Sequence, residues 1–181
     1  MKKILFVLTL FICALQLAGA QDKNSLRVGL GADYFDTSNE SDSKPGWSYP
    51  SLFAEYGHRF NSVFSAVATI NTDFRRYQRE IGEHKFVLSV CGMARPFAKM
   101  DYLDRLEIGL GFAGQYRDFY DGGRLTMFEP GLDIPVRVYI LDTAKFDLSL
   151  ASYYRFFYSK GEGNGFRLYD INLAVMFGVK F

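Results

Sequence analysis

The sequence predicts an all-β protein: an eight-stranded antiparallel up-and-down barrel that spans a membrane and has a polar, plugged lumen. Three observations predict it. Apolar and polar residues alternate over segments of about ten residues, the length of a tilted strand that crosses a bilayer. After the first 20 residues, no stretch of about 18 apolar residues could form a transmembrane helix. The polar positions of the alternating segments hold eight acidic and eight basic residues, a balance that suits a closed interior.

Residues 1–20 are predicted to be a removable signal peptide, and residues 21–181 a single domain. Two lysines precede an apolar segment, residues 4–17, and the run Ala-Gly-Ala before Gln21 fits the small-x-small cleavage rule. The 161 residues that remain are enough for one core.

Five segments alternate strictly and are predicted to be strands. They are residues 26–34, 105–112, 128–138, 146–156 and 169–181. Three further segments alternate less regularly and complete the eight. They are residues 49–59, 63–74 and 85–96, in which Val67, Val87 and Met93 break the pattern.

The connections are predicted to alternate between long and short, with both chain ends on the side of the short turns. Residues 36–48, 75–84, 118–124 and 159–165 are polar or rich in glycine, whereas 60–62 and 141–144 are short. Residues 97–104 form a connection that is longer than this plan requires.

Alternation alone does not say which face points inward, because a soluble barrel has its apolar face inside. The lumen of eight strands is narrow, so small residues belong there. Glycines gather on the polar face: Gly29, Gly31, Gly57, Gly109, Gly111, Gly131 and Gly178. The polar face is therefore predicted to line the lumen and the apolar face to contact lipid.

Two sets of charges share the polar face, and a closed lumen must pair them. The acidic residues are Asp33, Glu55, Asp73, Glu107, Glu129, Asp133, Asp147 and Asp170. The basic residues are Arg27, Arg59, Arg95, Arg105, Arg117, Arg137, Arg155 and Lys180. The densest group is predicted to plug the lumen with ion pairs, the alternative being a polar-ligand site or a proton path. Its members are Arg105, Glu107, Arg117, Glu129, Asp133 and Arg137.

Aromatic residues near the strand ends are predicted to form two interfacial belts, because amphipathic rings favour the headgroup region. One belt comprises Tyr34, Trp47, Tyr49, Phe74, Tyr116, Tyr154, Tyr158 and Tyr169. The other comprises Phe60, Phe97, Tyr139, Phe146, Phe177 and Phe181.

The last strand ends on an alternating apolar series, Val175, Phe177, Val179 and Phe181. This pattern resembles the C-terminal signal that outer-membrane barrels present to their assembly machinery. The chain is similar to the small eight-stranded OmpA/OmpX-type barrels and to the Bacteroidota "outer membrane protein beta-barrel domain" group. The resemblance implies a monomer in a bacterial outer membrane, with periplasmic termini. It also implies lipid and lipopolysaccharide as surroundings, and the barrel-assembly machinery as a partner during biogenesis.

Two sequence motifs have simpler structural explanations. Residues 109–114 match G-x-G-x-x-G, but they lie inside a strand rather than between a strand and a helix, so a nucleotide site is not expected. His58 and His84 fall at strand ends, and neither matches the His-x-Ser-Asn pattern of lipid A deacylases. Two histidines and Cys91 do not make a metal site, and no cofactor is expected.

A structural or binding role in the envelope is the function the sequence favours. Without Lys2 and Lys3, 19 basic residues face 20 acidic ones, which gives no reason to expect nucleic-acid binding. A basic group in the second predicted loop could contact lipopolysaccharide phosphates: Arg75, Arg76, Arg79 and Lys85. The alternatives are a lipid A-modifying enzyme that uses His84 with a neighbouring acid or serine, a small channel, and an accessory barrel of a secretion system.

Overall fold

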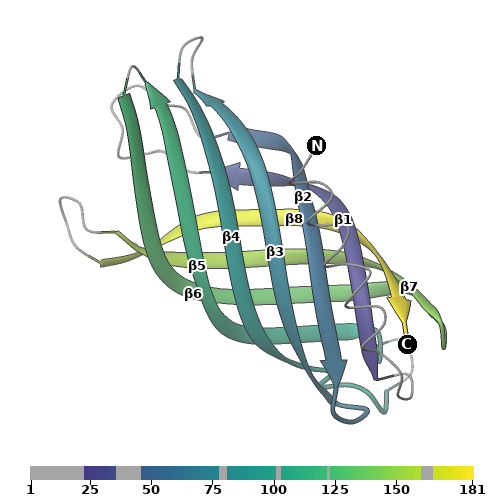
Figure 1. Ribbon diagram of the computed structural model, residues 1–181. Helices are drawn as coiled ribbons and strands as arrows, with labels where there is room; N and C mark the ends of the chain where they lie inside the picture. The colour runs from purple at the N-terminus through teal and green to yellow at the C-terminus, as the bar shows by residue number, and fades with distance from the viewer. Residues whose placement is uncertain (1–22, 36–45, 78–80, 101–102, 122, 160–164) are drawn as a thin grey trace.

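The computed structural model is a closed barrel of eight antiparallel strands (Figure 1). The structure describes residues 23–35, 46–77, 81–100, 103–121, 123–159 and 165–181. Within these ranges it describes side chains everywhere except at 35, 46–49, 74–77, 81–83, 118–121, 123–127, 159 and 165–169. The predicted signal peptide therefore lies outside the described residues.

Each strand pairs with the next along the chain, and β8 pairs with β1 to close the barrel. The strands are β1 (Asn24–Phe35), β2 (Gly46–Arg59), β3 (Phe64–Tyr77), β4 (Ile81–Ala94), β5 (Leu106–Asp121), β6 (Gly123–Asp142), β7 (Phe146–Ser159) and β8 (Gly165–Lys180). The predicted fold class is thus confirmed. In the part of the chain that the structure describes, no helix has the length and hydropathy needed to cross a bilayer.

The two ends of the barrel differ, and we name them by their connections. The terminal end holds the start of β1, the end of β8 and the turns at 60–63, 95–105 and 143–145. The loop end is the opposite one. Short side chains shape the terminal-end turns: the Asn61 side-chain oxygen accepts hydrogen bonds from the Val63 and Phe64 amides, both at 2.8 Å. The Thr143 hydroxyl likewise pairs with the Phe146 backbone.

The polar positions of the strands face the lumen and the apolar positions face outward, as predicted. Arg27, Glu55 and Asp133 are buried, whereas Leu110 and Phe112 project from the outer surface, where Phe112 is 76% exposed. Such a continuous apolar exterior is unfavourable in water and suits a hydrocarbon environment.

The predicted connections at the loop end were too long, and the expected alternation of long and short connections is wrong. β3 continues to Tyr77 and β4 begins at Ile81, while β5 and β6 extend across most of 118–124. The longest terminal-end connection, 95–105, spans more residues than those at 78–80 or 122. A β-ladder needs only backbone hydrogen bonds, so it continues past the point where lipid ceases to impose alternation.

The residues that broke the predicted pattern are lumen residues. Val67 and Met93 pack with Cys91 inside the barrel, and Val87 packs with Ala113 and Phe157. Apolar side chains fill lumen space between the ion pairs, so an apolar residue can occupy the inward face without a register shift.

Tyr139 is the one described aromatic belt residue that the structure places inside the barrel instead of at an interface. It is buried on β6, just before a register shift between Tyr139 and Leu141. Phe60, Phe97, Phe146 and Phe177 are exposed on the outside at the terminal end, where the second belt was predicted. The side chains of Trp47, Tyr49, Phe74 and Tyr169 lie outside the described residues.

Candidate functional site

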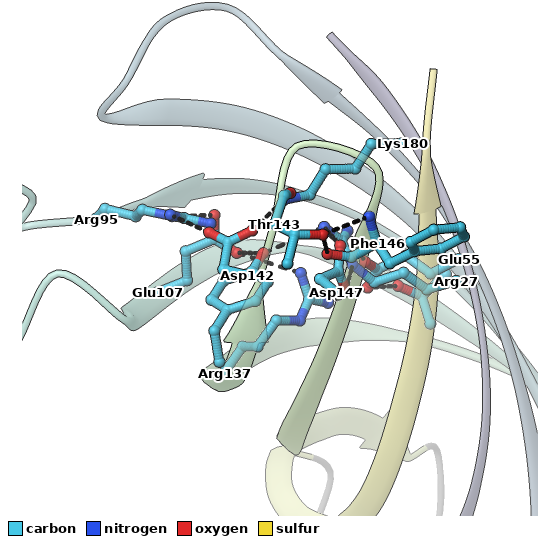
Figure 2. Close-up of polar contacts among 12 residues, drawn as sticks. Arg27, Glu55, Arg95, Glu107, Arg137, Asp142, Thr143, Phe146, Asp147 and Lys180 are labelled. Atoms are coloured by element: carbon cyan, nitrogen blue, oxygen red, sulfur yellow. Dashed lines mark hydrogen bonds and ion pairs between the residues drawn. The ribbon is translucent and has the colours of Figure 1, made fainter. Parts of the chain in front are cut away.

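The lumen near the terminal end is closed by a network of ion pairs (Figure 2). Arg27 on β1 lies at its centre. Its guanidinium binds Asp147 through two hydrogen bonds, Nε to Oδ1 at 2.9 Å and Nη2 to Oδ2 at 3.0 Å. Nη1 donates to Glu55 Oε1 at 2.9 Å. A planar guanidinium that engages two carboxylates in this way is held in a single orientation.

Glycine makes the room that Arg27 needs. A Cβ atom added at Gly178 would lie 2.6 Å from Asp147 Oδ1 and 2.8 Å from Arg27 Cγ. One added at Gly57 would lie 2.6 Å from Ser25 Oγ and 3.2 Å from Arg27 Nη1. The glycines of the polar face therefore allow the charged side chains to pack in a narrow lumen.

Arg137 crosses the lumen from β6. Its Nη2 lies 2.5 Å from Glu55 Oε2 on β2, and its Nη1 lies 3.2 Å from Glu107 Oε2 on β5. In an eight-stranded barrel β2 and β6 are diametrically opposite, so the Arg137–Glu55 pair spans the interior.

Tyr139 organises the arginines around it. Its hydroxyl donates to Glu107 Oε2 at 2.8 Å and accepts from Arg27 Nη2 at 3.2 Å. The guanidinium carbons of Arg95, Arg27 and Arg137 lie 4.3, 5.7 and 5.9 Å from the centre of the ring. These distances are typical of cation–π contacts. The ring thus helps three like charges to share a small volume.

The network reaches solvent at the terminal end. Arg95 binds Glu107 at 3.1 Å and Asp142 at 2.9 Å. Lys180 binds Asp142 and donates to the Thr143 carbonyl oxygen at 2.6 Å. Burial lowers the pKa of the Arg95 guanidinium, but the nearby Glu107 and Tyr139 raise it by more. The net pKa therefore lies above its usual value.

The charges of this terminal cluster balance. Its four cations are Arg27, Arg95, Arg137 and Lys180, and its four anions are Glu55, Glu107, Asp142 and Asp147. A buried charge that loses its partner costs several kcal/mol, so a matched set is the arrangement in which a closed lumen is stable.

A second cluster lies closer to the loop end. Lys85 on β4 is fully buried and contacts Asp33 at 2.6 Å, Asp73 at 3.7 Å and also Asp170. Beside it, Arg155 on β7 binds Asp133 at 3.2 Å. β4 and β8 are also opposite strands, so the contact of Lys85 with Asp170 is a second tie across the lumen.

Buried amides complete this second cluster. Arg155 Nη1 donates to Asn71 Oδ1 at 2.5 Å, again between opposite strands, β7 and β3. The Asn172 amide donates to Asp33 Oδ1 at 2.8 Å. Three ties between opposite strands therefore cross the described part of the lumen.

The six residues predicted to plug the lumen do not form one group. Glu107 and Arg137 belong to the terminal cluster, and Asp133 belongs to the second cluster. Arg117 pairs with Glu129 at 3.7 Å in a separate place, where Gln115 also binds Glu129 at 2.8 Å. Arg105 is exposed at the terminal end, where it donates to the Ile140 carbonyl oxygen at 3.1 Å. The reason is geometric: Glu107 pairs with Arg137, and Asp133 with Arg155, at directly opposite positions of neighbouring strands, so charges at different heights along the lumen fall into separate groups.

The predicted lipopolysaccharide contact of Lys85 is wrong, because this residue has no exposed surface and its ammonium group binds carboxylates in the lumen. Arg79 and the side chains of Arg75 and Arg76 lie outside the described residues. The backbones of Arg75 and Arg76 belong to β3, in register with Glu83 and Gly82 of β4.

The two histidines lie near opposite ends of the barrel. His84 Nε2 lies 2.8 Å from the Thr72 hydroxyl, which is also 3.1 Å from the Lys85 carbonyl oxygen. His58 Nδ1 lies 2.8 Å from Asn24 Oδ1. The glycines of residues 109–114 lie within β5, as predicted. Among the described residues no group of three or more His, Cys, Asp or Glu side chains could hold a metal ion.

Sequence reasoning missed the organising role of Tyr139 and the lumen position of Lys85. Both follow the strand parity: Tyr139 is two residues after Arg137, and Lys85 is two residues before Val87, which is itself inward-facing. If the alternation of inward and outward positions is continued beyond the apolar segments of β4 and β6, it places both side chains in the lumen.

Several solved outer-membrane barrels share this architecture. The crystal structure of Neisserial surface protein A matches with a TM-score of 0.59 and 15% identity, over 90% of this chain and 99% of that chain. The attachment invasion locus protein Ail of Yersinia pestis matches with a TM-score of 0.56 and 12% identity, over 89% of this chain and 99% of that one. The N-terminal barrel domain of Pseudomonas aeruginosa OprF matches with a TM-score of 0.56 and 10% identity, over 89% and 98%.

The fold is that of a small outer-membrane barrel. No protein-family model and no curated protein sequence matches the chain. At these identities the likeness concerns the barrel itself, so function has to be argued from this chain's own residues.

Proposed function

We propose that this chain resides in a bacterial outer membrane and has a structural and binding role there, rather than serving as a conduit. The observation that carries the proposal is the balanced terminal cluster, in which Arg137 and Glu55 join opposite walls of the lumen. With this plug inside and an apolar surface outside, the barrel is a filled cylinder that stiffens the membrane. Specific contacts are then made by the two ends of the barrel.

A deletion strain tests this role. Loss of the chain is expected to sensitise the host cell to detergent and to large hydrophobic antibiotics, and plasmid-borne wild-type protein is expected to restore resistance. In the outer-membrane fraction, the protein should migrate differently on a gel with and without boiling, because a closed barrel resists SDS when cold. Unchanged permeability together with a soluble, unshifted protein would remove the proposal.

We also propose that the termini face the periplasm and that the loop end faces outward. β8 carries Val175, Phe177 and Val179 on its outer surface, where an assembly machine could read the last strand, and Phe181 follows directly. Cysteine introduced at Asn61, in a terminal-end turn, should be inaccessible to a membrane-impermeant maleimide in intact cells. The native Cys91 is buried, so the wild-type protein should not be labelled and serves as the negative control. Labelling of Asn61→Cys in intact cells would reverse the orientation.

The loop end is proposed to contact lipopolysaccharide phosphates through Arg75, Arg76 and Arg79, whose guanidinium groups suit phosphate. One structure of Ail holds the heparin analogue sucrose octasulfate, so a barrel of this fold can bind a polyanion. Replacement of all three arginines by glutamine should weaken lipopolysaccharide binding, whereas the same charge removed at Lys99, Arg105 and Lys145 of the terminal end should not. Equal effects would point to unspecific attraction.

A lipid-modifying enzyme remains a second candidate because of one contact. The Thr72 hydroxyl and His84 lie on outward-facing positions of β3 and β4, and Asp118 of β5 is in register with His84. A hydroxyl beside an imidazole is the arrangement of a base-activated nucleophile. His84→Ala should then change the mass spectrum of lipid A, and an unchanged spectrum would eliminate this candidate.

A further inference from the structure

The mouth of the barrel at the terminal end is a recess that opens to solvent. Its empty volume, including the solvent-filled part, is about 310 Å³. Residues from six strands of the closed sheet, β1, β2, β3, β5, β6 and β8, line it, together with Lys23, which directly precedes β1. Arg27 and Glu107 of the terminal cluster form part of its lining, so the recess lies directly on the plug.

The lining of the recess carries more positive than negative charge, and two of its cations take no part in the terminal cluster. Glu107, Arg27 and Lys180 line it, but each is already bound within the terminal cluster. Lys23 and Arg59 line it too, and neither forms an ion pair with any residue that the structure describes. Both therefore keep their charge available at the mouth.

The backbones of Lys23 and Arg59 lie side by side. The Arg59 amide donates to the Lys23 carbonyl oxygen at 2.7 Å, which fixes the two backbones next to each other. Arg59 is half-buried and is in register with Ser65 on β3. Ser25 and His58 add further hydrogen-bonding groups to the lining. A guanidinium, an ammonium and hydroxyl groups around one recess are the donors that recognise a phosphate group.

The outer wall next to the recess suits the apolar part of a lipid. Phe60 is 61% exposed and Phe64 is 55% exposed, and the ring of Phe60 packs edge-on against His58 with centroids 5.1 Å apart. Exposed aromatic rings with basic residues nearby in the chain are the pattern expected where a strand leaves the hydrocarbon region.

We propose that Lys23 and Arg59 form a phosphate-binding site in this recess. The phosphate comes either from a phospholipid headgroup, with its chains along Phe60 and Phe64, or from a free phosphate ion. The proposal does not depend on the proposed function, because it concerns the terminal rim and not the loop end or the plug.

The test compares two charge-matched double variants of the full chain in dodecyl maltoside micelles. Lys23→Gln/Arg59→Gln removes the two free cations of the recess. Lys99→Gln/Lys145→Gln removes two exposed cations from other turns of the same end. Both variants should keep the wild-type gel shift on boiling, which shows that the barrel has formed. Inorganic phosphate and dihexanoyl phosphatidylglycerol are titrated separately by calorimetry at low salt.

The expected result is that Lys23→Gln/Arg59→Gln weakens binding at least about tenfold, since two charge-assisted contacts are lost, while the control variant changes it less than about twofold. Tight phosphatidylglycerol binding that inorganic phosphate does not displace would identify the lipid headgroup as the source. Binding of inorganic phosphate alone would identify the free ion. An equal loss in both double variants, or no binding of either probe to the wild-type protein, would overturn the proposal.

Discussion

Arg137 on β6 and Glu55 on β2 join the two opposite walls of the barrel, with Nη2 2.5 Å from Oε2. Glu55 also accepts from Arg27 at 2.9 Å, so one carboxylate neutralises two guanidinium groups from different sides of the lumen. Glu107 also binds two guanidinium groups, but Glu55 is the acid of the terminal cluster that pairs with an arginine from the opposite wall.

Replacement of Glu55 by alanine is therefore expected to destabilise the barrel strongly. Arg137 and Arg27 would each lose a partner in a buried site, at a cost of roughly 3–5 kcal/mol in the free energy of unfolding. Urea unfolding of the variant and of the wild-type protein in micelles measures this change in the free energy of unfolding. The double variant Glu55→Leu/Arg137→Met removes both charges and should recover much of the loss, and no recovery would argue against a coupled pair.

The close approach of Gly178 to the cluster gives a second prediction. Gly178→Ala would press against the Asp147 carboxylate and Arg27, and such overpacking typically costs about 1–3 kcal/mol. Gly92→Ala is the matched control, because its Cβ would meet only the Leu110 carbonyl oxygen, at 4.0 Å. The two variants should separate clearly in unfolding midpoint, and equal midpoints would mean that the lumen can relax around Gly178.

Lys85 is expected to act as a structural cation. Lys85→Met would leave Asp33, Asp73 and Asp170 without their shared ammonium group, so the cold SDS-resistant form should disappear at a lower temperature than in wild type. Binding of lipopolysaccharide by the fraction that remains folded should be unchanged. A selective loss of that binding with wild-type stability would place Lys85 at the surface after all.

If the outer face contacts lipid, the cost of an arginine on that face should depend on its depth in the bilayer. Phe112→Arg, in the middle of β5, should cost about 2–4 kcal/mol in a bilayer, whereas Phe146→Arg at the terminal end should cost about 0–1 kcal/mol. Equilibrium folding into lipid vesicles measures both. Equal costs would mean that the apolar belt is not a depth-dependent lipid contact.

The sequence was sufficient to predict the barrel and its two faces, because lipid imposes a strict period of two on Leu110, Phe112 and their counterparts. The same signal stops where a strand leaves the membrane, so the ladder that continues to Tyr77 and Asp121 could not be seen. The pairing inside the lumen could not be predicted either. Arg137 meets Glu55 only because the register and closure of eight strands bring them together. Strand register and barrel closure depend on the whole chain and cannot be inferred from the residues around Arg137 or Glu55.

Conductance of the purified chain in a planar lipid bilayer tests the central claim most directly. The balanced terminal cluster and the three ties between opposite strands predict a silent membrane under applied voltage. Incorporation is verified by recovery of the heat-modifiable band from the same bilayer preparation. Stable, reproducible current steps from the wild-type protein would contradict a plugged lumen and would make the chain a channel.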